Sequence, residues 1–209
     1  MMSSKLEIMC TFIEPLLGTA PSDKNIYQTY IQGVANGAGN GNGHDDELDS
    51  LPVMDDKGRT VFHRNAEGKP ILYDYQIKGF LKDACSMQMR FEVSESKKLK
   101  AYKKIIDGLV FVWPRQIEII MPEGMEVGVL ERPLRAQTAM GERVALASSE
   151  SIAEGAKVVF EVESMNRNTV TKELIKEWFN YGRYRGLGQW RNGSFGRFRY
   201  QINALTSNW

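Results

Sequence analysis

The sequence has few cysteines and histidines and no long hydrophobic run. Its two cysteines, Cys10 and Cys85, have no second cysteine or histidine at the spacing of a metal site. We therefore expect two free thiols, a reducing compartment and a cytoplasmic protein. No apolar run approaches the roughly 20 residues of a membrane span, and residues 1–10 lack the apolar core of a signal peptide. We expect no membrane as a partner.

Charge is almost balanced over the whole chain, with a net charge of +1 for 209 residues. This balance excludes a general polycation, so any attraction to a polyanion must come from a local patch. Acidic residues are absent after Glu177, whereas that stretch carries five arginines: Arg183, Arg185, Arg191, Arg197 and Arg199. Hydrophobic residues make up 42% and aromatic residues 10%, which is enough for a folded core.

The length favours a single domain covering residues 1–209. Residues 36–43 read NGAGNGNG and are followed by an acidic stretch, so we expect a flexible insertion at about 36–57. Hydrophobic periodicity predicts strands at 5–13, 61–64, 109–113, 116–121, 127–130, 144–147, 157–163 and 196–202. It predicts helices at 75–84 and 171–181, and a short helix or a docked turn at 25–34. Residues 132–143 have the composition of a basic loop. This mixture indicates an α+β fold.

Two helix ends carry recognisable signals. Asp74 is a candidate N-cap for the helix at 75–84, and Thr171 or Asn168 for the helix at 171–181. Gly182 is placed to end the second helix.

Residues 182–200 contain five arginines, five glycines and five aromatic residues among 19. Glycine allows close approach of a backbone to an anion, arginine pairs with phosphate oxygens, and aromatic rings stack on bases. This combination suits sequence-tolerant contact with a single strand. The alternative is a tight connection whose aromatic residues belong to the core. The candidate nucleic-acid-binding residues are Arg183, Arg185, Gly186, Gly188, Gln189, Trp190, Arg191 and Asn192, joined by Arg132, Arg135 and Lys78.

Signatures of catalysis are weak. The glycines fit neither a dinucleotide fingerprint nor a P-loop. His44 and His63 have no partner at a useful spacing, and Ser148 and Ser149 have no nucleophile-elbow context. The acidic stretch from Asp45 to Asp56 does not match an EF-hand. We therefore expect no catalytic residues, no metal ligands and no cofactor.

The glycine-rich segment resembles the signature loop of the RAMP superfamily, the repeat-associated proteins of CRISPR complexes. The match lies in Arg185–Gly188, which reads RGLG, and in 193–198, which reads GSFGRF. Residues 77–82 (IKGFLK) are similar to a helix motif of that family's backbone subunits, although the family's preceding Pro-Gly is replaced by Asp74-Tyr75. The resemblance implies a ferredoxin-like (RRM-like) βαββαβ core with inserted loops, an antiparallel sheet with helices on one face, and RNA contact through the glycine loop and the sheet face.

The whole chain also resembles an uncharacterised family of phage and prophage proteins, in YDYQIKGFLKDA, RPLRAQTA and RGLGQWRNG. Three hypotheses follow. The first is a non-catalytic protein of phage type that binds single-stranded nucleic acid, RNA rather than DNA, and forms a homo-oligomer or filament. The second is an anti-defence factor that binds a host defence protein, since Trp, Tyr and Arg also dominate protein interfaces. The third is a metal-dependent ribonuclease that uses Asp45 or Asp46.

Overall fold

The computed structural model describes residues 3–22, 58–138 and 141–205. The short helix or docked turn predicted at 25–34 and the acidic insertion at 36–57 lie outside these ranges. The main sheet contains β1 (Ser4–Phe12), β7 (Val110–Trp113), β11 (Lys157–Ser164) and β12 (Phe198–Ala204), in the spatial order β12-β1-β11-β7. All its neighbouring pairs are antiparallel.

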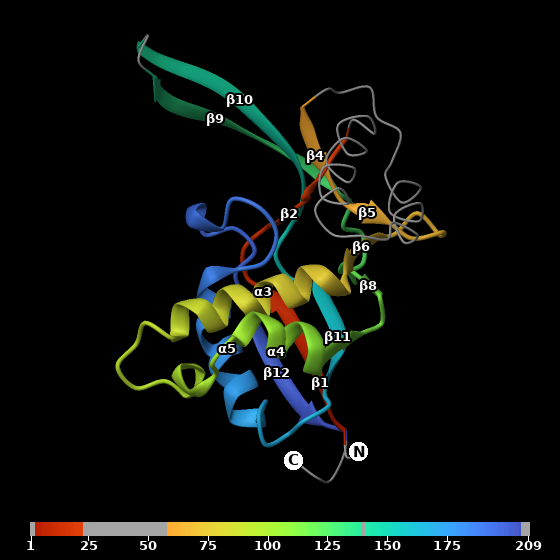
Figure 1. Cartoon of the computed structure of the whole chain (residues 1–209). Helices are drawn as coiled ribbons and strands as arrows, with labels where there is room; N and C mark the ends of the chain where they lie inside the picture. The colour runs from red at the N-terminus through yellow and green to blue at the C-terminus, as the bar shows by residue number, and fades with distance from the viewer. Residues whose placement is uncertain (1–2, 23–57, 139–140, 206–209) are drawn as a thin grey trace, which may run out of the picture.

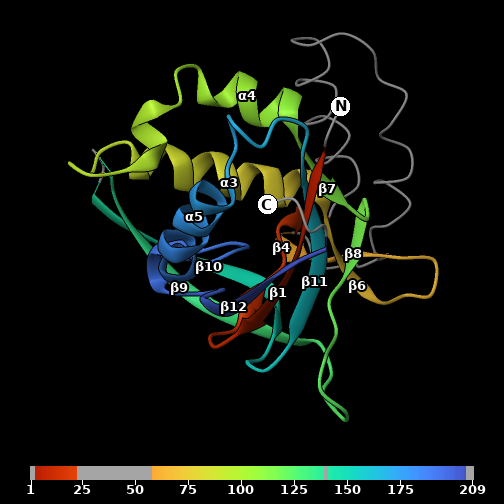
Figure 2. The same cartoon turned by 90° about the horizontal axis from the view of Figure 1, so that it is seen from below.

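Helices α3 (Asp74–Gln88) and α5 (Lys172–Arg185) connect these strands and cover one face of the sheet (Figures 1 and 2). Along the chain the order is β1-α3-β7-β11-α5-β12. This is the βαββαβ arrangement of a ferredoxin-like α+β fold, and the predicted fold class is confirmed.

Alternating residues of the central strands build the core. In β1 and β11 every second side chain points at the helices, as period-2 patterning requires. The buried side chains of these strands are Leu6, Ile8, Cys10, Phe12, Val158, Phe160 and Val162. Helix α3 adds Ile77, Phe80, Leu81, Ala84 and Cys85, and helix α5 adds Leu174, Ile175, Trp178 and Phe179. Burial of this apolar surface is the main force that holds the helices on the sheet.

The two helices approach each other closely at Gly182. A Cβ at this position would overlap the ring of Phe80 on α3, so only glycine fits the crossing. The prediction that Gly182 ends α5 is therefore wrong, because the helix continues to Arg185 and Gly186 is its C-cap. The N-cap prediction for Thr171 is confirmed, since its side chain accepts a hydrogen bond from Leu174 N at 3.1 Å.

Helix α3 begins at Asp74, one residue before the predicted start at residue 75. Tyr73 is the N-cap, and Asp74 is the first helical residue, where its negative charge still complements the helix dipole. The Tyr73 backbone N–H donates to Gln76 Oε1 at 2.8 Å. The helix start is therefore satisfied by Gln76 rather than by the predicted cap, Asp74.

A long hairpin replaces the predicted basic loop. Strands β9 (Gly128–Thr138) and β10 (Gly141–Ile152) pair antiparallel over their whole length and extend away from the main sheet (Figure 1). The loop prediction for 132–143 is thus wrong. Its polar residues and Pro133 are not typical of a strand. Among the described strands, however, β9 pairs only with β10, and proline is tolerated on such an edge.

Short strands hold the root of this hairpin. Strands β2 (Leu16–Leu17) and β4 (Arg59–Val61) pair with β10, and β3 (Ala20–Pro21) pairs with β4, which together with β9 makes a second sheet.

A third sheet contains β5 (His63–Arg64), β6 (Pro70–Tyr73) and β8 (Gln116–Glu118). The strand predicted at 61–64 is therefore split at Phe62. There the buried Glu150 of β10 accepts hydrogen bonds from Phe62 N at 2.7 Å and Arg64 Nη2 at 2.6 Å.

The segment after α3 is fixed to α5 by one carboxylate. This segment forms the 3₁₀ turn η1 (Glu95–Lys98) and helix α4 (Tyr102–Leu109). Glu177 of α5 accepts hydrogen bonds from Ser94 Oγ (2.8 Å), Glu95 N (2.7 Å), Ser96 N (3.1 Å) and Ser96 Oγ (2.6 Å). Burial alone raises the pKa of Glu177, but these donors outweigh it and hold the pKa below its ordinary value.

We expect Glu177→Gln to reduce the free energy of unfolding by about 1–3 kcal/mol at pH 7, because an amide places hydrogens against these donors. A lowered folded-state pKa means that the stabilisation is present above pH 4.5, the ordinary value. It is lost as pH falls through the folded pKa. Urea unfolding of the variant and of wild type at pH 7 and pH 3 measures the loss of stability and its dependence on pH. Glu123→Gln changes a carboxylate in an exposed turn and serves as the control. If Glu177→Gln were destabilised by the same amount at pH 7 and at pH 3, the role assigned to the ionised Glu177 would be contradicted.

Candidate functional site

The loop that follows α5 is closed at its base by glycines. Gly186 and Gly196 adopt positive φ angles of 81° and 69°, and a Cβ on either would overlap backbone atoms across the loop. Leu187 N donates to Gly196 O at 3.0 Å, and Gly196 N donates to Pro15 O at 2.8 Å. Gly188 lies against the backbone of Leu17. These three glycines therefore pack the loop onto the protein itself.

Two arginines of the loop share one carboxylate from α3. Asp83 Oδ2 lies 2.9 Å from Arg191 Nη1 and 3.4 Å from Arg185 Nε. Arg185 also donates to Asn192 Oδ1 at 2.8 Å. The sequence shows no acidic residue close to these arginines because Asp83 lies 108 positions before Arg191. Two guanidinium groups against one carboxylate leave a local charge of +1. All three side chains are 28–30% exposed, so this charge can reach a ligand.

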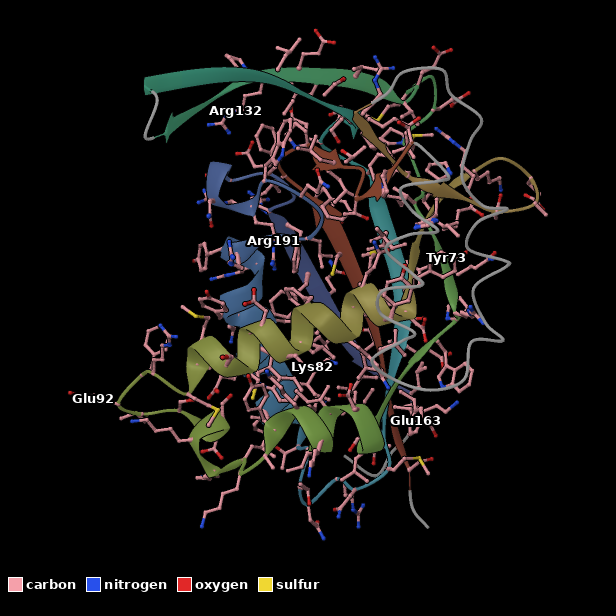
Figure 3. All side chains as sticks on the ribbon, turned by 45° about the horizontal axis from the view of Figure 1, so that its top comes forward. Tyr73, Lys82, Glu92, Arg132, Glu163 and Arg191 are labelled. Atoms are coloured by element: carbon pink, nitrogen blue, oxygen red, sulfur yellow. The ribbon has the colours of Figure 1, made fainter. Side chains whose placement is uncertain are left out.

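Arg132 adds a third guanidinium from the hairpin. A Cβ built on Gly193 would lie 2.7 Å from Arg132 Nη1, so the Arg132 side chain lies directly over the exposed end of the loop. Figure 3 shows Arg132 on the hairpin and Arg191 on the loop below it. The structure thus brings together Arg132, Arg185 and Arg191, three of the predicted residues, from two distant segments.

The other predicted residues of the loop have different surroundings. Gln189 connects the loop to its neighbours, since it accepts from Thr60 Oγ1 at 3.1 Å and donates to Thr19 O at 3.5 Å. Trp190 is half-buried with a positive φ of 49°, and its ring meets the Phe195 ring edge-on at 6.1 Å. Such a backbone conformation is rare for a bulky residue, and it often marks a functional position.

Two of the predicted residues lie away from this cluster. Lys78 points toward α4 and β7, where its Nζ lies 3.3 Å from Asp107 O and 4.9 Å from the centre of the Phe111 ring. Arg183 stacks on Tyr184, with 4.6 Å between its guanidinium carbon and the ring centre. The backbone of Arg135 lies in β9, and its side chain is outside the part of the chain that the structure describes.

A groove of about 300 Å³ lies between the glycine loop and α3. Its lining combines apolar and polar residues from three segments, which are Thr19, Leu72, Gln76, Phe80, Leu187 and Arg191, with Gly79 and Gly188 at its walls. Thr19, Leu72 and Gln76 were not predicted as site residues. The apolar run that leads into α3 marks the position of Leu72 and Gln76, whereas no sequence pattern marks Thr19.

The sheet face opposite the helices has a different charge. Glu7, Glu161 and Glu163 project from it near Lys5, which lies 3.6 Å from Glu161 and 3.7 Å from Glu163. Lys157 and Arg199 project from the same face, on either side of Thr11. Trp113 is 49% exposed there, and its Nε1 donates to Glu163 at 3.2 Å. The three carboxylates and three cationic groups leave this face without the net positive charge that attracts phosphate. We therefore leave this face, where the family resemblance implied RNA contact, out of the candidate site.

Within 3–22, 58–138 and 141–205, no group of three His, Cys, Asp or Glu side chains is placed to hold a metal ion. In the same ranges, the helices are too short or too polar to cross a membrane. His63 is buried, with its ring edge-on to Tyr73 at 4.9 Å. His44, Asp45 and Asp46 lie outside the described residues.

No family model and no curated protein matches the chain. Among solved structures, the chain is similar to a chain in the cryo-EM structure of the type III-B Cmr-beta bound to cognate target RNA. The TM-score is 0.57 and the identity 10%, and the match covers 98% of this chain but 61% of that chain. At this identity the likeness concerns the fold. It supports the fold that the RAMP resemblance implies.

We expect Gly196→Ala to destabilise the protein much more than Gly68→Ala. Both residues have positive φ, 69° and 76°, but only Gly196 has backbone atoms where a Cβ would lie. The backbone conformation costs about 1–2 kcal/mol in each variant, and the overlap at Gly196 adds about 1–3 kcal/mol. Chemical unfolding of both variants measures the difference. Equal losses would show that the loop does not depend on this close contact.

Proposed function

We propose that the chain is a non-catalytic protein that binds single-stranded nucleic acid, RNA in preference to DNA. The strand lies along the surface formed by Arg132, Arg185 and Arg191 and by the groove beside them. The observation that carries this proposal is the gathering of three guanidinium groups at the glycine loop: Arg191 lines the groove and shares the Asp83 carboxylate with Arg185, and Arg132 reaches the loop at Gly193.

The chemistry of these groups fits a strand backbone. A guanidinium offers paired N–H donors to phosphate oxygens, and its flat face stacks on a base. Asn192 is exposed at the tip of the loop and adds a polar group. Trp190 presents a half-buried ring next to Arg191, and ring stacking on a base contributes about 1–3 kcal/mol. Such contacts read the backbone and the base faces, so little sequence preference is expected.

Asp83 weakens the positive charge but also fixes two side chains in place. Its carboxylate holds Arg185 and Arg191 side by side, which lowers the entropy that these side chains lose when a phosphate binds. A carboxylate between two guanidiniums leaves further N–H donors on each of them for a ligand. We therefore assign Asp83 a positioning role and assign the phosphate contacts to the arginines.

The preference for RNA has separate support. The structurally similar chain belongs to a complex described as bound to cognate target RNA. That property belongs to the other complex, and for this chain it is part of the proposal. The homo-oligomer, the host defence partner and the phage origin stay predictions. So does the ribonuclease alternative.

The test is binding of a labelled single-stranded RNA oligomer over a range of salt concentrations. In the triple variant Arg132→Ala, Arg185→Ala, Arg191→Ala we expect affinity to fall at least tenfold. The slope of log K against log salt should become shallower by about 0.7 for each phosphate that the variant no longer neutralises. Both effects follow because guanidinium–phosphate pairing releases counterions from the strand.

The control removes the same charge elsewhere. Lys97→Ala, Lys98→Ala, Lys100→Ala changes three exposed lysines around η1 and leaves the groove intact. We expect this variant to keep most of the affinity and a slope close to that of wild type. If both triple variants bind RNA equally well, the charge acts from the whole surface and the assigned site is wrong.

A further inference from the structure

The groove between α3 and the glycine loop has the character of a small-ligand site. Leu72, Phe80 and Leu187 give it an apolar floor, and Thr19, Gln76 and Arg191 give it a polar rim. Its volume of about 300 Å³ lies at the small end of the range for ligand pockets. Arg191, at one end of the groove, belongs to the cluster that binds phosphate in the proposed function.

One wall of the groove is open because residue 79 is glycine. Gly79 lies inside α3, where glycine destabilises the helix relative to alanine. It has no positive φ, and a Cβ at this position would have no atom within 4 Å. Neither backbone geometry nor packing therefore requires glycine here, in contrast to Gly182. The effect of the missing side chain is to leave the groove accessible from the helix side.

Gln76 presents a fixed amide at the rim. Its Oε1 accepts from Tyr73 N at 2.8 Å, and its Nε2 donates to Thr19 Oγ1 at 2.7 Å. An amide group has two hydrogens and two lone pairs, so one of each remains for a ligand. A donor and an acceptor side by side match the hydrogen-bonding edge of a nucleobase.

We propose that this groove is a subsite for one nucleobase of the bound strand. The base lies flat over Leu72, Phe80 and Leu187, and its edge meets the Gln76 amide. Its phosphate lies near Arg191. This inference rests on the proposed function and adds to it a pocket that takes up one base, separate from the ring of Trp190.

The test uses Gly79→Leu in the full chain and two labelled single-stranded RNA oligomers of equal length. One oligomer carries bases, and the other is an abasic ribose-phosphate strand. The leucine side chain fills the groove. We expect the variant to bind the base-bearing strand about tenfold more weakly than wild type does. Its affinity for the abasic strand should be unchanged, because Arg132, Arg185 and Arg191 are intact.

Gly108→Leu is the matched control, since Gly108 also lies in a helix, α4, with no atom within 4 Å of a Cβ. We expect it to bind both strands as wild type does. Both variants should melt at or above the wild-type temperature, because leucine favours a helix more than glycine does. This result would show that a loss of binding is not a loss of folding.

The outcomes separate the two proposals. If Gly79→Leu binds the base-bearing strand as wild type does, the base subsite is overturned while strand binding stands. If Gly79→Leu lowers the affinity for both strands equally, the groove holds the backbone, and the base subsite is again overturned. If wild type binds neither strand, the proposed function fails, and the subsite fails with it.

Discussion

The close crossing of α3 and α5 at Gly182 determines where the rest of the site lies. Because no side chain separates the helices there, the ring of Phe80 packs directly on the α5 backbone. Helix α5 then ends beside α3, and the glycine loop begins next to Asp83 and Gly79. The ion pairs of Asp83 and the groove both depend on this position. A wider separation of the helices would take Arg185 and Arg191 out of reach of Asp83.

Charge is distributed so that the two faces of the protein differ. The glycine-loop side combines three guanidinium groups with the carboxylate of Asp83, whereas the carboxylates and the cations of the open sheet face balance. The net charge of +1 does not show this division. Local electrostatics therefore favour a polyanion along the glycine loop over one on the sheet.

Strong periodic patterns were the parts of the fold that could be predicted. The alternation in β1 and β11 and the apolar face of α5 agree with the structure, because burial on one face imposes a regular pattern. The middle of the β9–β10 hairpin was missed, since the described side chains of β9 are exposed or half-buried and show no alternation that marks a strand. The ends of α3 and α5 were misplaced because Asp74 and Gly182 carry cap signals that tertiary contacts override.

The sequence by itself determined the central strands, the two helices that cover them, the α+β class and the concentration of arginine and glycine near the C-terminus, while the ferredoxin-like order came from the family resemblance. The first group of features depends on residues close together in the chain. Only the tertiary structure decided which arginines act together, which glycines pack against backbone and how charge is divided between the faces. The partners Asp83, Arg132 and Gly79 come from segments far from the loop, and local sequence carries no record of contacts made across such distances.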